Sequence, residues 1–302
     1  MNFFVYNFNI RVLEKRETDS FFSTEGDAIL DIKSDTSLVK VDAPSIIADP
    51  FLFAKGEELF LFYEHQDKWI GGKGRLCMRK TKDLIDWTDE VDVLVEPFHL
   101  SYPFVFEDNG MVYMLPETGN DNSIRLYVAK EDSLTKWELV KKIVDDGLPW
   151  KDSVIYKKDG YYYLFTSHNV NHQQEQHLFV ANDLMGPYTE HPMSPIYTGA
   201  DGGRNAGSII EYEGSIYRPA QVCIRSYGEQ TSIMRIETLS PTEYKETLHK
   251  KNIVDTQNKT FREGGHQFNP IQFKGKWIVA TDNRKKNYNL VETFRKIWKV
   301  VR

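Results

Sequence analysis

The chain has 302 residues, of which 40% are hydrophobic and 13% aromatic, a composition typical of folded rather than disordered proteins. Its formal net charge of −6 gives no electrostatic reason to expect a nucleic acid or an anionic membrane as a partner. The two cysteines, Cys77 and Cys223, form neither a CxxC pair nor a Cys/His cluster, which excludes a disulfide framework and a zinc motif.

The N-terminal segment, residues 1–48, precedes the first recurrent unit of the chain. Its first ten residues lack the basic region and apolar stretch of a signal peptide, so we expect a cytoplasmic protein. No run of 18 apolar residues occurs anywhere, and we predict no transmembrane segment. We expect the strand Phe3–Phe8 to pair beside the C-terminal segment Ile297–Val301 and so close the fold.

Five copies of one pattern follow along the chain. Each copy starts with a polar residue, continues as an alternating apolar strand, turns at a glycine and returns as an aromatic-rich strand. The copies are Asp49–Glu64, Tyr102–Glu117, Asp152–His168, Ala206–Gln221 and Gln267–Asp282, and their turn glycines are spaced by 54, 50, 54 and 61 residues. Because glycine accepts the positive φ of tight turns, each copy predicts a β-hairpin.

A second strand pair lies between successive hairpins. Each of these segments reads as a short apolar strand, a polar loop with a leucine and then an aromatic residue: Arg75–Trp87, Arg125–Trp137, His177–Tyr188 and Ser232–Tyr244. Four strands per repeat of about 50 residues are typical of propeller blades. We therefore predict an all-β fold, a five-bladed β-propeller with four-stranded antiparallel blades, as a single domain over residues 1–302.

The polar ends of the hairpins are expected to meet at one mouth on the propeller axis. In an antiparallel hairpin the start of the first strand lies beside the end of the second. The strand starts contribute Asp49, Tyr102, Asp152, Arg204 and His266, and the strand ends contribute Glu64, Glu117, His168, Arg218, Gln221 and Asp282. The alternative is a polar channel that binds nothing.

Carboxylates and amides at this mouth suit the hydroxyl groups of a carbohydrate, and aromatic rings such as Trp150 and Tyr227 suit the apolar face of a sugar. Paired carboxylates also suit glycosyl transfer, in which one acid protonates the leaving oxygen and another carboxylate acts as base. We predict Asp49, Glu117 and Asp152 as catalytic residues. Each has a structural alternative: a strand-end cap, a salt bridge between blades and turn initiation, respectively.

Further residues are predicted to bind the substrate. The arginines Arg204 and Arg218 suit a phosphate, because guanidinium groups bind phosphate oxygens bidentately; neutralising the carboxylates is the alternative. The remaining predicted contacts are Glu64, His99, Tyr102, His168, Gln221, Tyr227 and His266. The short basic run Arg284–Lys286 is expected to be solvated.

Several motifs carry a family resemblance. ADPF (48–51) and Asp152 resemble the arabinanase/xylosidase-type five-bladed propeller glycosidases. The closer resemblance is to the propeller region of the glucosamine inositolphosphorylceramide transferases, through ADPFLF (48–53), FYE (62–64), PFHLSYPFVF (97–106), YMLPET (113–118), RNAG (204–207) and YRPAQVC (217–223). It implies a carbohydrate-active protein that helps to build a glycoconjugate.

The glycosidase resemblance implies that Asp49 is the general base and that Asp152 orients the general acid. The family places that acid on blade four, where this chain has Arg204 and Asn205, so Glu117 would have to supply the proton. Some of these relatives hold a central calcium ion through a blade-five histidine. His266 matches that position, with a hydrogen-bonding histidine as the alternative; apart from this calcium ion we expect no cofactor.

The first functional hypothesis is therefore a glycosyltransferase-type enzyme of surface-polysaccharide or glycolipid assembly, acting on a nucleotide sugar or glycolipid. A glycoside hydrolase with Asp49 as general base is the second, and a glycan-binding module that serves a partner glycosyltransferase is the third.

Overall fold

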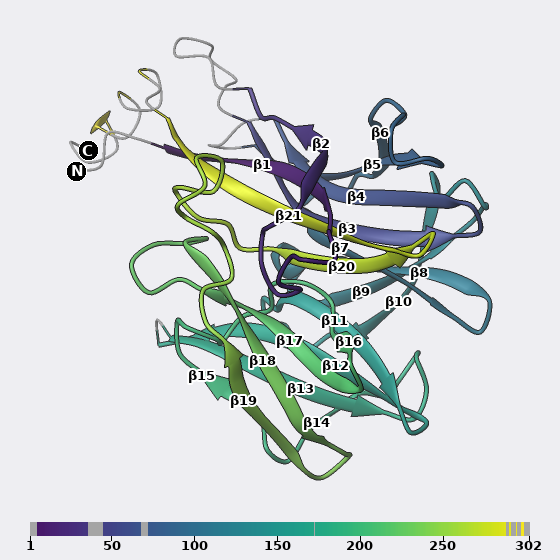
Figure 1. Cartoon of the computed structure of the whole chain (residues 1–302). Coiled ribbons are helices and arrows are strands. Elements are labelled where there is room, and N and C mark those ends of the chain that lie inside the picture. Colours follow the sequence, from purple (N-terminus) through teal and green to yellow (C-terminus); the bar gives the residue numbers. More distant parts are fainter. Residues whose placement is uncertain are drawn as a thin grey trace.

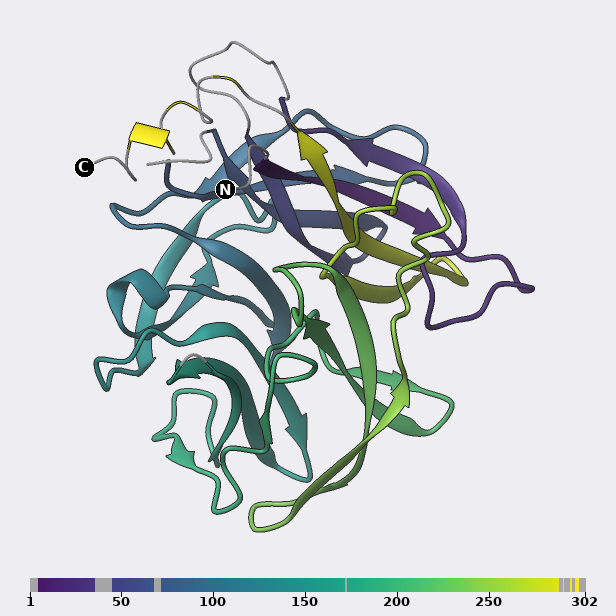
Figure 2. The ribbon, with the colours of Figure 1, turned by 90° about the vertical axis from the view of Figure 1, so that its left-hand side faces the viewer.

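The computed structural model describes residues 5–35, 45–67, 72–171 and 173–287, together with residues 290, 294, 297 and 298. Their strands form five antiparallel sheets around a central axis (Figures 1 and 2). This confirms the predicted all-β, five-bladed β-propeller. No helix among the described residues has the length and apolar character needed to span a membrane.

Blades one to four follow one another along the chain, and each is built from the axis outward. Blade one contains β3 (Ile46–Lys55), β4 (Glu58–Gln66), β5 (Arg75–Thr81) and β6 (Val91–Leu94). Blade two contains β7 (Ser101–Asp108), β8 (Met111–Glu117), β9 (Ile124–Ala129) and β10 (Trp137–Val144), with the 3₁₀ turn η1 (Gly119–Asp121) after β8.

Blade three contains β11 (Lys151–Lys158), β12 (Tyr161–Val170), β13 (Gln173–Ala181) and β14 (Thr189–Glu190). It carries one extra strand, β15 (Tyr197–Thr198), which also pairs with β13. Blade four contains β16 (Ile210–Tyr212), β17 (Ser215–Val222), β18 (Gln230–Leu239) and β19 (Tyr244–Lys250).

Blade five joins the two ends of the described chain. Its inner strands are β20 (Phe268–Phe273) and β21 (Lys276–Asn287), and its outer strands are β1 (Val5–Glu14) and β2 (Asp27–Ile32). The N-terminal strand closes this blade by pairing with β21, with Phe8 opposite Arg284, whereas the expected pairing with Ile297–Val301 lies largely outside the described residues. Phe3, Phe4 and residues 299–301 lie outside the described residues.

The second strand of each blade is covered on both faces by neighbouring blades. In β4, seven of nine residues are buried, so its sequence reads as a nearly continuous apolar run. The largest buried cluster packs Phe51, Tyr102, Phe165 and Tyr244 from blades one to four. Burial of large aromatic side chains supplies most of the stabilisation that holds such blades together.

The inner strands of blades one, two and three share one irregularity at the mouth. Their pairing shifts register after Ala48, Ser101 and Lys151. The next residue in each strand has a left-handed backbone, with φ of 53° at Asp49, 50° at Tyr102 and 49° at Asp152. Such bulges re-aim a side chain, and left-handed non-glycine residues cost about 1–3 kcal/mol each. Strain repeated at equivalent positions marks this end of the axis as a candidate site.

Candidate functional site

A cavity of about 310 Å³ lies at this mouth. The strand ends that form the mouth face the viewer in Figure 2. Blades one, two, three and five supply strand ends to the cavity, and two loops supply Arg204 and Tyr227. Seven of the predicted site residues line the cavity: Asp49, Glu64, His99, Glu117, Arg204, Tyr227 and His266. The repeat therefore located the mouth correctly, whereas the roles of these residues stay predictions.

Asp49 and Asp282 hold His266 between them. The Nδ1 atom of His266 lies 2.7 Å from Oδ2 of Asp282, and its Nε2 atom lies 3.2 Å from Oδ1 of Asp49. Burial opposes the charge on His266, but the two carboxylates outweigh it and raise the pKa of the imidazole well above its usual range. Burial also raises the pKa of Asp49, and His266 opposes that shift.

The same three residues bear on the predicted calcium ion. Asp49, His266 and Asp282 each offer one possible ligand atom, and these atoms lie within 4.8 Å of one another. Oδ1 of Asp49, Nδ1 of His266 and Oδ2 of Asp282 are buried and form no hydrogen bond of acceptable geometry with the described residues. Buried carboxylate oxygens of this kind suit a calcium ion, so these three residues are the ones that would hold it; an imidazolium between the two carboxylates is the alternative.

A second charge group joins Glu117, Asp152 and Arg204 from three blades. Nε of Arg204 donates to Oδ2 of Asp152, its Nη2 atom lies 3.1 Å from Oδ1 of Asp152, and the same Nη2 atom lies 3.4 Å from Oε2 of Glu117. Nε2 of Gln221 donates to Oδ2 of Asp152 at 2.8 Å. Asp152 is thereby fixed from two sides.

The two carboxyls of this group have opposite pKa shifts. Burial raises the pKa of Glu117 to about 8; the negative charge of Asp152 adds to this, and Arg204 opposes it. Burial acts in the same direction on Asp152, but the Arg204 guanidinium outweighs it and holds the pKa of Asp152 below its usual range. At neutral pH, Glu117 therefore carries a proton beside an ionised Asp152, which is the arrangement of a general acid and its neighbour.

Glu64 and His99 form the wall of the cavity on the side of blade one. The backbone N–H of Gly74 donates to Nδ1 of His99 at 2.8 Å, which leaves the proton on Nε2, 3.5 Å from Oε1 of Glu64. Burial lowers the pKa of His99 and raises that of Glu64 well above its usual range. A neutral imidazole and a protonated carboxyl are both suited to hydrogen bonds with sugar hydroxyls.

Other predicted contacts lie outside the cavity. The Tyr102 hydroxyl donates to the backbone O of Gly207 and accepts from its N–H, at 3.0 and 2.7 Å. Arg218 is fully buried and pairs with Glu246 at 2.6 Å. The His168 ring lies against Trp150, with ring centroids 5.4 Å apart. In this structure these three side chains contact protein, and Gln221 reaches the site only through Asp152.

Sequence reasoning missed Lys151 as a cavity residue. Lys151 lines the cavity, and so do Ala48 and Ser101, which occupy the same position one residue before the left-handed residue of their blades. The repeat alone could therefore have predicted Lys151 as a cavity residue. No ion-pair partner of Lys151 occurs among the described residues, and its ammonium group opposes the raised pKa of Glu117.

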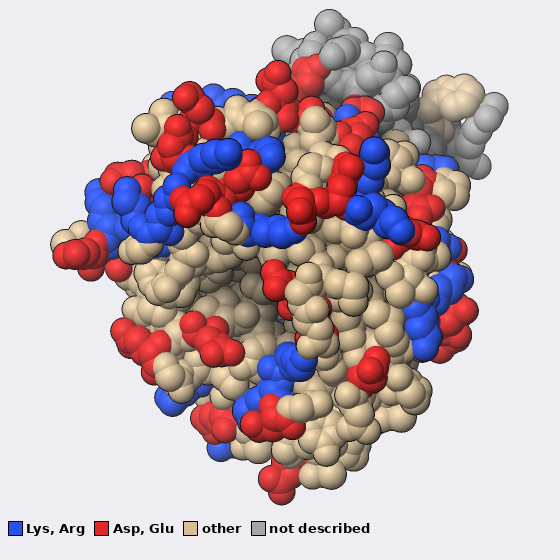
Figure 3. Space-filling view, turned by 90° about the vertical axis from the view of Figure 1, so that its right-hand side faces the viewer, with Lys and Arg blue, Asp and Glu red and all other residues tan. Residues whose placement is uncertain are grey.

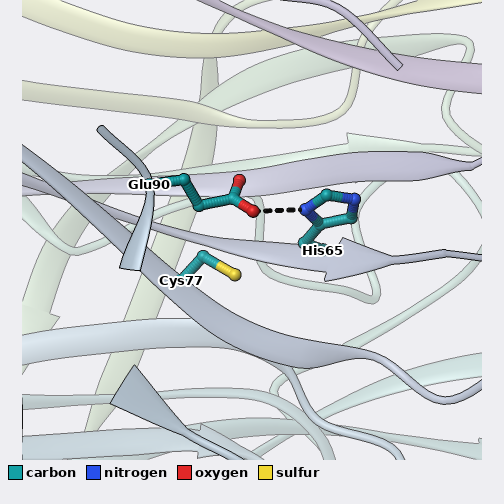
Figure 4. Close-up of side chains that lie close together, drawn as sticks. All are labelled: His65, Cys77 and Glu90. Carbon is teal, nitrogen blue, oxygen red and sulfur yellow. Dashed lines mark hydrogen bonds and ion pairs between the residues drawn. The ribbon is translucent and has the colours of Figure 1, made fainter. Parts of the chain in front are cut away.

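A separate cluster in blade one joins His65 of β4, Cys77 of β5 and Glu90, just before β6, whose potential metal-ligand atoms lie within 4.8 Å of one another (Figure 4). Nδ1 of His65 lies 2.8 Å from Oε1 of Glu90. Arg75 occupies the same cluster, with Nη2 3.7 Å from Oε1 of Glu90 and Nε 2.7 Å from Oδ1 of Asp92. Because the guanidinium already neutralises these acids, the cluster fits a salt-bridge network.

Comparison with known proteins identifies relatives. Residues 27–283 match the family described as glucosamine inositolphosphorylceramide transferase 1, N-terminal. Glucosamine inositolphosphorylceramide transferase 1 of Oryza sativa subsp. japonica is 33% identical over 250 residues, which cover 79% of this chain and 33% of that protein. The chain thus spans about a third of the length of the curated relatives that it matches.

Solved structures with a similar fold are glycoside hydrolases. A family 117 glycoside hydrolase from Zobellia galactanivorans has a TM-score of 0.55 and 13% identity, covering 82% of this chain and 87% of that chain. The α-L-arabinanase of Cellvibrio cellulosa in complex with arabinohexaose has a TM-score of 0.51 and 18% identity, covering 67% and 77%. At these identities the likeness shows the fold alone. Both resemblances predicted from the sequence are confirmed.

Proposed function

This chain belongs to the family described as glucosamine inositolphosphorylceramide transferase 1, N-terminal, and we propose that its central cavity transfers a glycosyl group in the assembly of a glycolipid or surface polysaccharide. One observation carries the proposal: Glu117 lines the cavity with its pKa raised to about 8, and Arg204 joins it to the ionised Asp152, which lies outside the cavity lining. A carboxyl that is protonated at neutral pH can donate to a leaving oxygen.

The proposed reaction divides the proton transfers between two carboxyls. Glu117 gives its proton to the glycosidic oxygen of the donor while the bond from that oxygen to the anomeric carbon breaks. Asp49 takes the proton of the acceptor hydroxyl while the new bond to the anomeric carbon forms. Its raised pKa makes Asp49 a stronger base than an ordinary carboxylate, and His266 fixes its position. Exchange with solvent then restores both residues.

The protonated state of Glu117 also favours one class of donor. An alcohol leaving group needs a proton, whereas a phosphate leaving group departs as an anion without one. A glycoside or glycolipid donor therefore suits Glu117 better than a nucleotide sugar does. Hydrolysis is the second candidate, because Asp49 and Glu117 would act in the same way on a water molecule as acceptor. A partner glycosyltransferase stays a prediction.

The experiment compares Glu117→Gln with a matched control, Glu107→Gln, on the exposed part of the neighbouring strand β7. Each protein is incubated with alkyl glycosides and a glycolipid acceptor, and products are identified by mass spectrometry. Loss of the general acid should lower the rate by about 10²–10⁴-fold. The loss should be much smaller for a nitrophenyl glycoside, whose leaving group needs no proton, and Glu107→Gln should act as the unmodified chain does.

Each product distinguishes between the functions. A glycosylated acceptor supports transfer, and free sugar with water as the acceptor supports the hydrolase. Saturable sugar binding without any product would contradict both and leave a glycan-binding module. Equal activity of Glu117→Gln and the unmodified chain on alkyl glycosides would remove Glu117 from the reaction.

A further inference from the structure

A second cavity, of about 540 Å³, lies on blade five between the mouth ends of β1 and β21 and the loop that precedes β20. Seven Lys or Arg side chains line it but only two acids, Asp31 and Glu263. This balance is the reverse of that of the whole chain, whose formal charge is −6. On the opposite face, which carries the hairpin turns, charges of both signs lie intermixed (Figure 3). We call this cavity the basic groove.

Few of these cations are neutralised by the protein. Arg11 forms two hydrogen bonds with Asp31, at 2.6 and 2.7 Å, and thereby takes up one of the two acids. Lys33, Lys259, Arg262 and Lys285 are exposed, and no ion pair joins any of them to another described residue. The groove therefore keeps a positive charge that is available to a ligand.

Arg284 gives the groove a buried cationic anchor, contrary to the expectation that the run Arg284–Lys286 is solvated. Its side chain is 6% exposed. The guanidinium donates to neutral acceptors: the hydroxyl of Ser226 at 2.9 Å and the backbone O atoms of Tyr227 and Glu263. Its Cζ atom lies 4.3 Å from the centroid of the Tyr6 ring, and no carboxylate of the described residues lies within ion-pair distance of it. A buried charge is normally paired, so an anionic ligand would complete this environment.

The basic groove adjoins the central cavity. Phe8 lines the central cavity, the next residue, Asn9, lines the groove, and both lie on β1. Arg284 bonds to the backbone of Tyr227, whose ring lines the central cavity. One strand and one loop thus separate the two, so a molecule with a sugar in the cavity can extend an anionic group into the groove.

We propose that the basic groove binds a phosphate ester group of the substrate. Arginine and lysine side chains are the ones that bind phosphate oxygens most strongly, and here they come from β1, the residue after β2, the loop that precedes β20, and β21. The proposed phosphate site depends only on the residues of the basic groove. Its connection to a sugar in the central cavity rests on the proposed function.

The test measures the binding of two phosphate probes, one soluble and one in a lipid membrane, to one groove variant. Inorganic pyrophosphate is titrated by calorimetry, and flotation is followed with phosphatidylcholine vesicles that contain or lack phosphatidic acid. The variant Arg262→Gln/Lys285→Gln removes two exposed groove cations. The control Lys130→Gln/Lys136→Gln removes the same charge from an exposed loop of blade two. Loss of two charge-assisted contacts should weaken binding about tenfold or more in the groove variant and leave the control near the unmodified chain.

Weakened pyrophosphate binding supports a soluble phosphate ester, and weakened binding only to vesicles with phosphatidic acid supports a lipid head group. No saturable binding to either probe, or an equal loss in the control variant, overturns the groove as a phosphate site. Glu117→Gln should retain the binding, because Glu117 lies in the central cavity. A failure of the groove is therefore distinguishable from a failure of the proposed transfer reaction.

Discussion

Replacing Arg204 by methionine tests whether the charge group at the mouth is held as the structure indicates. The substitution removes the hydrogen bonds from Arg204 to Asp152 and to Glu117. Asp152 is 1% exposed, so its carboxylate would remain buried without its cation. Breaking such a pair from one side costs about 3–5 kcal/mol. For a chain of 302 residues the unfolding entropy is about 0.6 kcal/mol/K, so the Tm should fall by about 5–8 °C.

The cost should depend on pH in a defined direction. Arg204 holds the pKa of Asp152 low in the folded chain, so the pair stabilises the fold above the ordinary pKa of an aspartate, about 3.9, and loses this effect as the pH falls. In Arg204→Met the burial of Asp152 is no longer opposed by the guanidinium and raises the pKa of its carboxyl, so the variant takes up a proton as the pH falls from 7 towards about 4. The difference in stability between Arg204→Met and the unmodified chain should therefore shrink over this range.

Urea denaturation followed by tryptophan fluorescence measures the free energy of unfolding at both pH values. Adding Asp152→Asn to Arg204→Met should restore part of the loss, because the buried charge is then absent. Lys55→Met is the control: Lys55 pairs with the exposed Asp132, and such surface pairs contribute about 0–1 kcal/mol. A loss below about 1 kcal/mol for Arg204→Met, or one that is equal at both pH values, would refute the reasoning.

Three further predictions concern the mouth and its support. Glycosyl transfer should slow as the pH rises through about 8, because Glu117 then loses its proton. The free energy of unfolding should fall as the pH rises from the ordinary pKa of a glutamate to about 8, because Glu117 stays protonated only in the folded chain. A rate that stays constant well above pH 8 would contradict this. Tyr102→Phe should lower the free energy of unfolding by about 1–3 kcal/mol, because it leaves the buried N–H of Gly207 without a partner. The KM for the sugar should stay unchanged. A large change in KM would show that Tyr102 contacts the substrate. Gly207→Ala should lower the free energy of unfolding by at least about 2 kcal/mol, because the new Cβ would lie 2.2 Å from the backbone O of Phe268 and the φ of residue 207 is 145°. Gly110→Ala, in an open turn, should lower it by about 1 kcal/mol. Equal losses for the two variants in urea denaturation would refute the close approach at Gly207.

The repeat placed the hairpins and the mouth correctly because both depend on local patterns. Alternation and turn glycines define each hairpin: Asn109 and Gly110 in the second turn both have positive φ, as a tight turn requires. Since every hairpin has the same direction, its polar ends fall at the same end of the axis. This is why residues as far apart as Glu64 and His266 could be assigned to one cavity.

The ion pairs between individual side chains could not be predicted from the sequence. Arg204 and Arg218 were both assigned to the mouth, yet Arg204 lies on a loop and lines the cavity, whereas Arg218 lies in the middle of β17 and is buried against Glu246. Which acid lies beside which arginine depends on side-chain directions and on register shifts within blade four, such as the one between Ile236 and Thr238. Neither appears as a pattern in the residues.

The sequence by itself determined the number of blades, the direction of each hairpin and the polar mouth, because these follow from strand periodicity and turn chemistry within about 50 residues. The tertiary structure alone decided that β1 pairs with β21, that Arg204 joins Glu117 to Asp152, and that Arg284 is buried next to the mouth. Ring closure brings residues of different blades within hydrogen-bond distance, and burial then sets their charge states.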